Sequence, residues 1–194
     1  MSKILVDTID TRSGTSTLTL GSSNLTTLTK ASGVNTNGLS ISMAMCYRLT
    51  TDKSISAAAA TVIDGNWEKA DTDDAGHIGS DMSESSGVFT YPSTGIYLVQ
   101  FSIQLQGPSQ GATYAGGKIL TTADNNNYST AAINYNSIYH TNGYANAFMS
   151  FIHDVSSTGN DKVRFVGECE FACNIEGDSN ANYTAVTFVR LGDT

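Results

Sequence analysis

The sequence predicts an all-β protein, and three observations lead to that prediction. Residues 95–105 alternate between two sets of side chains with a period of two, which is typical of a strand with one buried face. The 194 residues include 18 glycines and only 14% charged residues, so the helix formers Glu, Lys and Arg are scarce. No segment combines a 3.6-residue apolar period with capping residues at both ends. Together these features favour a β-sandwich or jelly roll.

The first 40 residues differ in composition from the rest of the chain. Two short apolar runs, "KILVDTI" and "TSTLTLG", are followed by the polar stretch "SSNLTTLTKASGVNTNG". This segment has too little apolar area to form a core of its own, so it is either a disordered tail or a segment that orders against a partner. Its aliphatic side chains exceed what a tether requires: Ile4, Val6, Ile9, Leu18 and Leu20. We therefore interpret residues 1–40 as a docking arm that adds a strand to a sheet in another chain.

Residues 41–194 have the strand and turn signals of a head domain. Strands are expected near residues 44–50, 59–64, 87–91, 95–105, 114–120, 131–140, 147–155, 162–171 and 183–191. Pro92 and Gly95 predict a sharp turn between the third and fourth of these strands. The expected core strand residues flank that turn: Phe89, Tyr97, Val99, Phe101 and Ile103.

The net charge of −8 argues against nucleic-acid binding, which normally requires a basic patch. No run approaches the roughly 20 apolar residues that cross a bilayer, so we expect no membrane insertion. The first residues lack the apolar core of a secretory signal, and we expect no export route.

The three cysteines are expected to be buried free thiols. If residues 163–173 formed one strand, Cys169 and Cys173 would lie about 13 Å apart, too far for a disulfide. Cys46 has no obvious partner.

Several motifs in the head occur in the order found in a known superfamily. Phe89, Pro92, Gly95 and Tyr97 fit a Phe-x-x-Pro-x-x-Gly-x-Tyr pattern within one residue, and "FIHDVSSTGNDKVRFV" at 151–166 and "FVRL" at 188–191 follow it. The last motif lacks the usual glycine. The chain from 46 to 194 thereby resembles the jelly-roll superfamily of the complement one-q globular head and tumour necrosis factor. The resemblance implies an antiparallel, ten-stranded jelly-roll sandwich that packs as a homotrimer around an apolar and aromatic axis.

The N-terminal segment "MSKILVDTIDTRSGTSTLTLGSSN" is similar to the beginnings of small fibre-like virion proteins of tailed bacteriophages. That resemblance implies a virion component that is assembled in the host cytoplasm and whose arm contacts other tail or capsid proteins.

No catalytic, cofactor or metal site is expected from the motifs. The segment "ATYAGGKI" at 112–119 lacks two residues that a phosphate-binding loop requires, and no nucleophile elbow is present. The three histidines are isolated from one another. The run "DTDDAG" at 71–76 begins like a calcium loop, but Met82 stands where a bidentate glutamate belongs. The sequence leaves open whether the Asp- and Asn-rich loops bind calcium.

Residues 113–146 are rich in tyrosine, asparagine and glycine, the composition of adaptable contact surfaces. They provide five candidates for a trimer interface or a receptor surface: Tyr114, Tyr128, Tyr135, Tyr139 and Tyr144. Two functions remain open for the whole chain. One is a fibre or knob that contacts a host glycan or protein, and the other is a capsid decoration protein; an enzyme is not expected.

Overall fold

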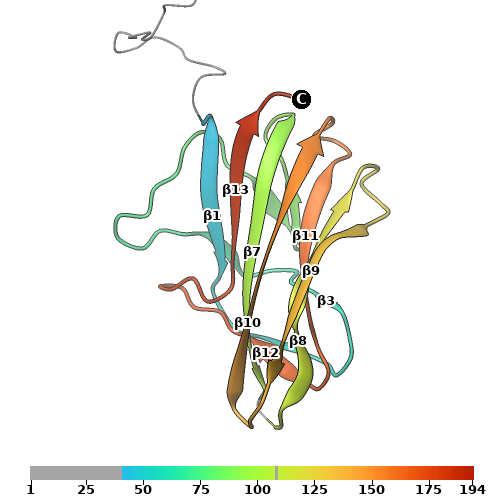
Figure 1. Cartoon of the computed structure of the whole chain (residues 1–194). Helices are drawn as coiled ribbons and strands as arrows, with labels where there is room; N and C mark the ends of the chain where they lie inside the picture. The colour runs from blue at the N-terminus through green and yellow to red at the C-terminus, as the bar shows by residue number, and fades with distance from the viewer. Residues whose placement is uncertain (1–40, 108) are drawn as a thin grey trace, which may run out of the picture. The chain divides into compact units, whose positions relative to one another are not determined.

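The computed structural model describes residues 41–107 and 109–194, so the arm residues Ile4, Val6, Ile9, Leu18 and Leu20 lie outside the described part. Every regular element in the described residues is a strand (Figure 1). The strands are β1 (Met43–Leu49), β2 (Lys53–Ile55), β3 (Thr61–Val62), β4 (Trp67–Lys69), β5 (Ser83–Ser85), β6 (Val88–Thr90), β7 (Gly95–Gly107), β8 (Ala112–Thr122), β9 (Ser129–Ile138), β10 (Gly143–Val155), β11 (Lys162–Cys169), β12 (Cys173–Ile175) and β13 (Ala185–Gly192).

These strands form two antiparallel sheets, which confirms the all-β jelly-roll prediction. In the first sheet the order is β2-β12-β7-β13-β1-β4, with β10 on the other edge of β7. In the second sheet the order is β5-β6-β11-β8-β9, with β3 also paired to β11. The structure has more strands than the expected ten because the segment between β1 and β6 carries several strands of two or three residues.

The turn before β7 depends on a glycine, as the "YPSTG" segment predicts. Gly95 has a φ of 141°, and a Cβ there would lie 2.5 Å from the carbonyl oxygen of Gly192. The turn can therefore pack against the end of β13 only because residue 95 has no side chain.

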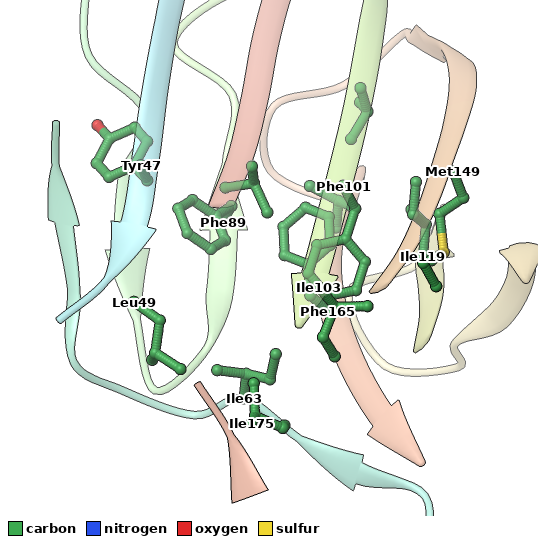
Figure 2. Packing of buried hydrophobic residues seen from close by; sticks show 14 of the residues in the cluster. Tyr47, Leu49, Ile63, Phe89, Phe101, Ile103, Ile119, Met149, Phe165 and Ile175 are labelled. Carbon is green, nitrogen blue, oxygen red and sulfur yellow. The ribbon is translucent and has the colours of Figure 1, made fainter. Parts of the chain in front are cut away.

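The core lies between the two sheets and combines aliphatic side chains with a cluster of aromatic rings (Figure 2). The predicted core residues Phe89, Tyr97, Val99, Phe101 and Ile103 are all fully buried. Phe165 packs on Phe101 with ring centroids 4.9 Å apart and on Phe89 at 5.6 Å. Burying each such side chain contributes roughly 1.5–3 kcal/mol.

The two sheets are joined along one edge by side chains. The amide of Asn134 on β9 donates to the carbonyl oxygen of Phe148 on β10 at 2.8 Å, and Asn136 donates to the carbonyl oxygen of Asn146. Backbone carbonyls of the edge strand β10 are thus satisfied without a further strand.

The strand expected at 162–171 is present but ends two residues earlier, and residues 163–173 do not form one strand. β11 ends at Cys169, the chain crosses from the second sheet to the first, and β12 begins at Cys173. The two cysteines are consequently both in the shared core, where they are buried and free. Burial, followed by hydrogen bonding to the Cys169 thiol, raises the pKa of Cys173. Cys46 is also free but only half-buried.

Candidate interface on the uncharged sheet face

The outer face of the first sheet is formed by every second residue of four adjacent strands. On β7 the inward set is fully buried, and the alternate set points away from the core. In the pairing of β10 with β7, β7 with β13, and β13 with β1, the outward residues of each strand lie beside outward residues of the next and form rows across the sheet. We call this surface the uncharged face, and it comprises Ala44, Cys46, Ile96, Leu98, Gln100, Ser102, Gln104, Gln106, Tyr144, Asn146, Phe148, Ser150, Ile152, Ala185, Thr187 and Val189.

One row of the uncharged face is apolar from edge to edge. Ile152 pairs with Leu98, Leu98 with Val189, and Val189 with Ala44. Two rows along, Phe148 lies beside Ser102. Phe148 and Ile152 are 54% and 52% exposed, so their side chains meet water rather than another part of the described chain. Large apolar side chains gathered on one sheet face are typical of an interaction surface.

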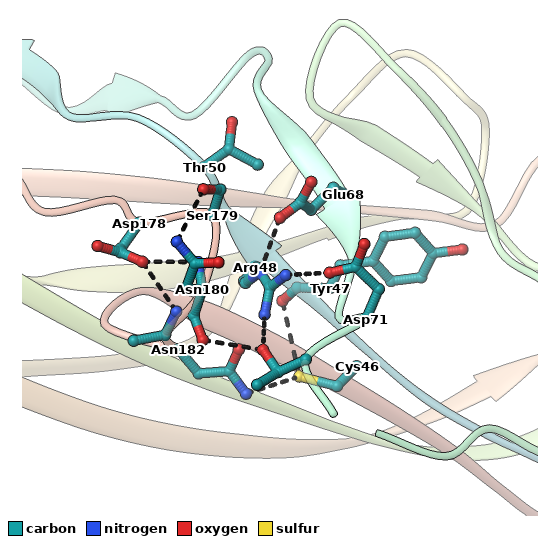
Figure 3. A network of polar contacts seen from close by, with 12 residues as sticks. Cys46, Tyr47, Arg48, Thr50, Glu68, Asp71, Asp178, Ser179, Asn180 and Asn182 are labelled. Atoms are coloured by element: carbon teal, nitrogen blue, oxygen red, sulfur yellow. Dashed lines mark hydrogen bonds and ion pairs between the residues drawn. The ribbon is translucent and has the colours of Figure 1, made fainter. Parts of the chain in front are cut away.

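Two charged residues lie at opposite corners of this face, Asp154 at the end of β10 and Arg48 on β1. Arg48 is only 1% exposed because the loop from residue 70 to 82 and the segment before β13 cover it (Figure 3). Its Nε donates to Glu68 at 2.7 Å, and its Nη2 pairs with Asp71. The hydrogen bond to Glu68 raises the pKa of Arg48 most, against the opposing effect of burial.

The loop that covers Arg48 is fixed to a second loop. Thr72 accepts a hydrogen bond from Nη1 of Arg48 at 2.5 Å and donates to the carbonyl oxygen of Asn180 at 2.8 Å. Asp178 in turn accepts from the backbone amides of Asn180 and Ala181. The carboxylates of Glu68 and Asp71 more than balance the positive charge of Arg48, and the covering loops keep its guanidinium away from the centre of the uncharged face.

The five tyrosines that the sequence suggested as one surface are divided among three places. Tyr144 is on the uncharged face, where its hydroxyl accepts from Gln106 at 3.0 Å. Tyr114, Tyr128 and Tyr135 are associated with the second sheet, and Tyr139 is in the turn between β9 and β10. Tyr114 and Tyr135 contact each other, with ring centroids 5.5 Å apart.

The outer face of the second sheet carries charged residues, which contact an opposite charge or an aromatic ring. Nζ of Lys118 lies 2.6 Å from Oε2 of Glu168, which also accepts from the hydroxyl of Tyr135. The guanidinium of Arg164 lies 3.8 Å from the ring centroid of Tyr128. Burial works to raise the pKa of Glu168, but hydrogen bonds from Lys118 and Tyr135 outweigh it and the net shift is downward.

The carboxylates in the Asp- and Asn-rich loops have partners within the protein. Asp124 accepts from the backbone amides of Asn126 and Asn127, and these bonds hold its pKa well below the usual range. Asp71 pairs with Arg48. Among residues 41–107 and 109–194 no group of three or more His, Cys, Asp or Glu side chains could hold a metal ion. Within these residues there is also no helix long and apolar enough to cross a membrane.

Four residues of the uncharged face were not among the interface candidates expected from the sequence: Leu98, Phe148, Ile152 and Val189. A signal for them exists in β10, where "YANAFMSFIHDV" carries large apolar side chains in both alternating sets. A strand that is apolar on both faces is normally buried on both. The sequence therefore contained a reason to expect a second covered face at β10.

Comparison with solved structures identifies the fold. The structure of Eiger TNF from S. frugiperda aligns with a TM-score of 0.58 and 16% identity, covering 80% of this chain and 96% of that one. Murine APRIL at pH 8.0 aligns with a TM-score of 0.53 and 13% identity, covering 77% and 98%. The PRD1 vertex protein P5 aligns at a TM-score of 0.47 and 11% identity, which is too weak to bear on function.

No protein-family model matches the chain, and no curated protein matches its sequence. The described residues thus have the jelly-roll fold that the sequence motifs implied, a fold shared with tumour-necrosis-factor-like proteins.

Proposed function

We propose that the chain is a virion structural protein that forms a homotrimeric knob, mounted on the particle by residues 1–40. The observation that carries the proposal is the uncharged face, on which Phe148 and Ile152 are exposed although the whole chain has a net charge of −8. A face without charge at its centre can pack against copies of itself without electrostatic repulsion.

A closed trimer fits this face better than an open assembly. Closed cyclic symmetry removes the exposed apolar row from water in every copy, whereas an open arrangement would leave it exposed at each end. Three copies are favoured because the superfamily that the motifs of residues 46–194 resemble packs as trimers. Other faces of the described residues carry ion pairs such as Lys118–Glu168 and lack a comparable apolar row.

The two ends of the head suit two different tasks. β1 begins at Met43, which pairs with Arg190 near the end of β13, so residue 41 enters the head beside the chain's C-terminus (Figure 1). The hairpin of β9 and β10 lies at the other end of β7, where Gly143 pairs with Gly107. The 13 residues of β7 separate these ends by about 40 Å. In a knob mounted by its arm, the β9–β10 end would point away from the particle.

Deletion of residues 1–40 tests the mounting role. The described core lies entirely within residues 43–188, so the truncated head should keep its melting temperature and its trimeric mass. Mass spectrometry of purified particles should then find no truncated protein. Incorporation at the full copy number would place the docking role elsewhere, and an unfolded head would make the arm part of the domain. A copy number in the hundreds on the capsid, instead of a few at the tail, would favour the decoration function.

A further inference from the structure

A surface hollow lies where β9 ends and β10 begins, at the end of the head that is farthest from residue 41. Three of the five candidate tyrosines line it, and all three come from the β9–β10 hairpin: Tyr135 on β9, Tyr139 in the turn and Tyr144 on β10. The remaining lining residues are small or carry amides and hydroxyls, namely Thr113, Asn136, Ser137, Ala145 and Asn146.

Two of the three rings in this hollow are exposed and do not belong to the core. Tyr139 is 84% exposed and Tyr144 is 52% exposed, and neither belongs to the buried cluster. An aromatic ring in water offers an apolar face and a polar tip, so it favours a ligand that has both C–H and hydroxyl groups. The hydroxyl of Tyr144 accepts from Gln106 and keeps its own proton free to donate.

The amides of the hollow are oriented by the fold. Asn136 uses its Nδ2 to donate to the carbonyl oxygen of Asn146, which leaves its Oδ1 as an acceptor. The turn that carries Tyr139 is fixed because the backbone amide of Asn142 donates to Gly107 at 2.7 Å and that of Gly143 to His140 at 2.9 Å. Asn142 adopts a φ of 58°, which asparagine tolerates in such turns. The site is thus largely formed before any ligand arrives.

The charges around the hollow select against acidic ligands. None of its eight lining residues is charged at neutral pH. The nearest carboxylates belong to Glu168, which accepts from Tyr135, and to Glu170, which accepts from the amide and hydroxyl of Thr113. Lys118 balances the charge of Glu168, but Glu170 has no ion-pair partner among the described residues and no lining residue offers a positive charge, so an anionic ligand would be disfavoured.

We propose that this hollow binds a neutral saccharide, which stacks on Tyr139 and receives hydrogen bonds from the amides and tyrosine hydroxyls around it. Vicinal hydroxyl groups match the amide donors and acceptors, and the C–H face of a pyranose ring matches the exposed aromatic ring. The proposal rests on the knob function proposed above and adds host contact to it. Tyr144 and Asn146 belong both to the hollow and to the uncharged face, whereas Phe148 and Ile152 lie farther along β10.

Saturation-transfer NMR on the full-length protein tests the proposal. The probes are methyl glycosides of neutral hexoses and N-acetylhexosamines at millimolar concentration, with a sialylated trisaccharide as the acidic comparison. We expect saturation transfer to at least one neutral glycoside and none to the sialylated sugar. Tyr139→Ala should reduce the signal at least tenfold, whereas Tyr139→Phe should keep most of it because the ring remains.

Tyr183→Ala is the matched control, because Tyr183 is 45% exposed but lies outside the hollow. It should bind as the unaltered protein does. Equal binding by Tyr139→Ala, preference for the acidic sugar, or no transfer to any neutral glycoside would overturn the proposal. Such a result would leave the knob function standing if the protein is still trimeric and still enters particles through residues 1–40, so the two failures are distinguishable.

Discussion

The two outer faces of the sandwich have the same backbone architecture but opposite surface chemistry. On the second sheet, Lys118 pairs with Glu168, and Arg164 covers the ring of Tyr128. On the first sheet, the central rows carry aliphatic, aromatic, amide and hydroxyl groups, and Arg48 is hidden beneath a loop. The outer face of the second sheet therefore carries charged side chains, one pair of which is joined by an ion pair, whereas the centre of the uncharged face carries none.

The two faces of this β-sandwich therefore differ in how favourably each can be buried against another chain. A charged residue that is paired on its own face is stable in water and costly to bury against another chain. An exposed Ile or Phe side chain, by contrast, is unfavourable in water and is stabilised when another chain covers it. Ile133 and Ile152 illustrate this difference, because they lie on opposite faces and are 51% and 52% exposed. Their exposure is the same, so only the chemistry of their neighbours distinguishes the two positions.

The largest expected effect is loss of the trimer on Ile152→Glu. The substitution puts a carboxylate into the apolar row formed with Leu98 and Val189, and copies of the chain would have to bury it unpaired. Light scattering should give the single-chain mass of 20.5 kDa, whereas the unaltered protein should give about three times that mass. Ile133→Glu is the control and should remain trimeric. Dissociation by Ile133→Glu, or a stable trimer with Ile152→Glu, would assign assembly to the wrong face.

The next effect separates the inner from the outer side of β7. In the Ile152→Glu background, Phe101→Ala should lower the free energy of unfolding by about 3–5 kcal/mol because it leaves a cavity beside Phe165. Gln100→Ala on the outer side should change it by less than about 0.5 kcal/mol in the same background. Urea titration measures both values. A larger loss with Gln100→Ala would invert the assigned facing of the strand.

The side chains of β7 that face the core were predictable from the sequence. Successive side chains of a strand alternate between its two faces, and the apolar set marks the buried face. The turn at Gly95 was predictable for the same local reason. The uncharged face was not predicted, because it requires knowing that Ile152, Leu98 and Val189 become neighbours across three strands. Such rows are set by strand order, which alternation within one strand does not encode.

Two other features also depend on long-range topology. The crossing between Cys169 and Cys173 interrupts a segment whose alternation suggests one continuous strand. Arg48 is in a strand and has the charge of a surface residue. It is nevertheless met by Glu68 from the neighbouring strand β4 and by Asp71 and Thr72 from the loop that follows, all 20 or more residues away in the sequence. The tyrosine-rich block suggested a contact region, but its division into three places follows from the positions of β8, β9 and β10.

A smaller, pH-dependent effect is expected from His153, which neighbours Ile152 on β10 but points into the core. Its Nδ1 lies 2.9 Å from the hydroxyl of Tyr91, and burial lowers the pKa of His153 below 6.5, although Asp161 and Asp154 oppose the shift. Protonation therefore favours the unfolded chain. The stability contributed by the neutral ring is complete above pH 6.5 and is lost as the pH falls from there to the lowered folded value.

In that window the free energy of unfolding should fall by at most about 1.4 kcal/mol per pH unit. Urea titrations between pH 7.5 and 5 would measure this dependence. His153→Gln should flatten the curve relative to the unaltered protein. Trimer mass should stay constant until unfolding begins, because His153 is not on the uncharged face. A trimer that dissociates in this window while still folded would connect His153 to the interface.

The smallest effect is expected on the second sheet, from Lys118→Met. Lys118 and Glu168 keep 20% and 17% of their side chains exposed, so water still screens the pair, and Tyr135 remains as a hydrogen-bond donor to the carboxylate. We expect a loss of less than about 1 kcal/mol in the free energy of unfolding, smaller still at high salt, with the trimer intact. A double-mutant cycle with Glu168→Gln isolates the coupling between the two side chains. A loss of several kcal/mol, or a change in the mass of the assembly, would mean that the charged face is also buried against another chain, and the contrast between the two faces would no longer explain how the head assembles.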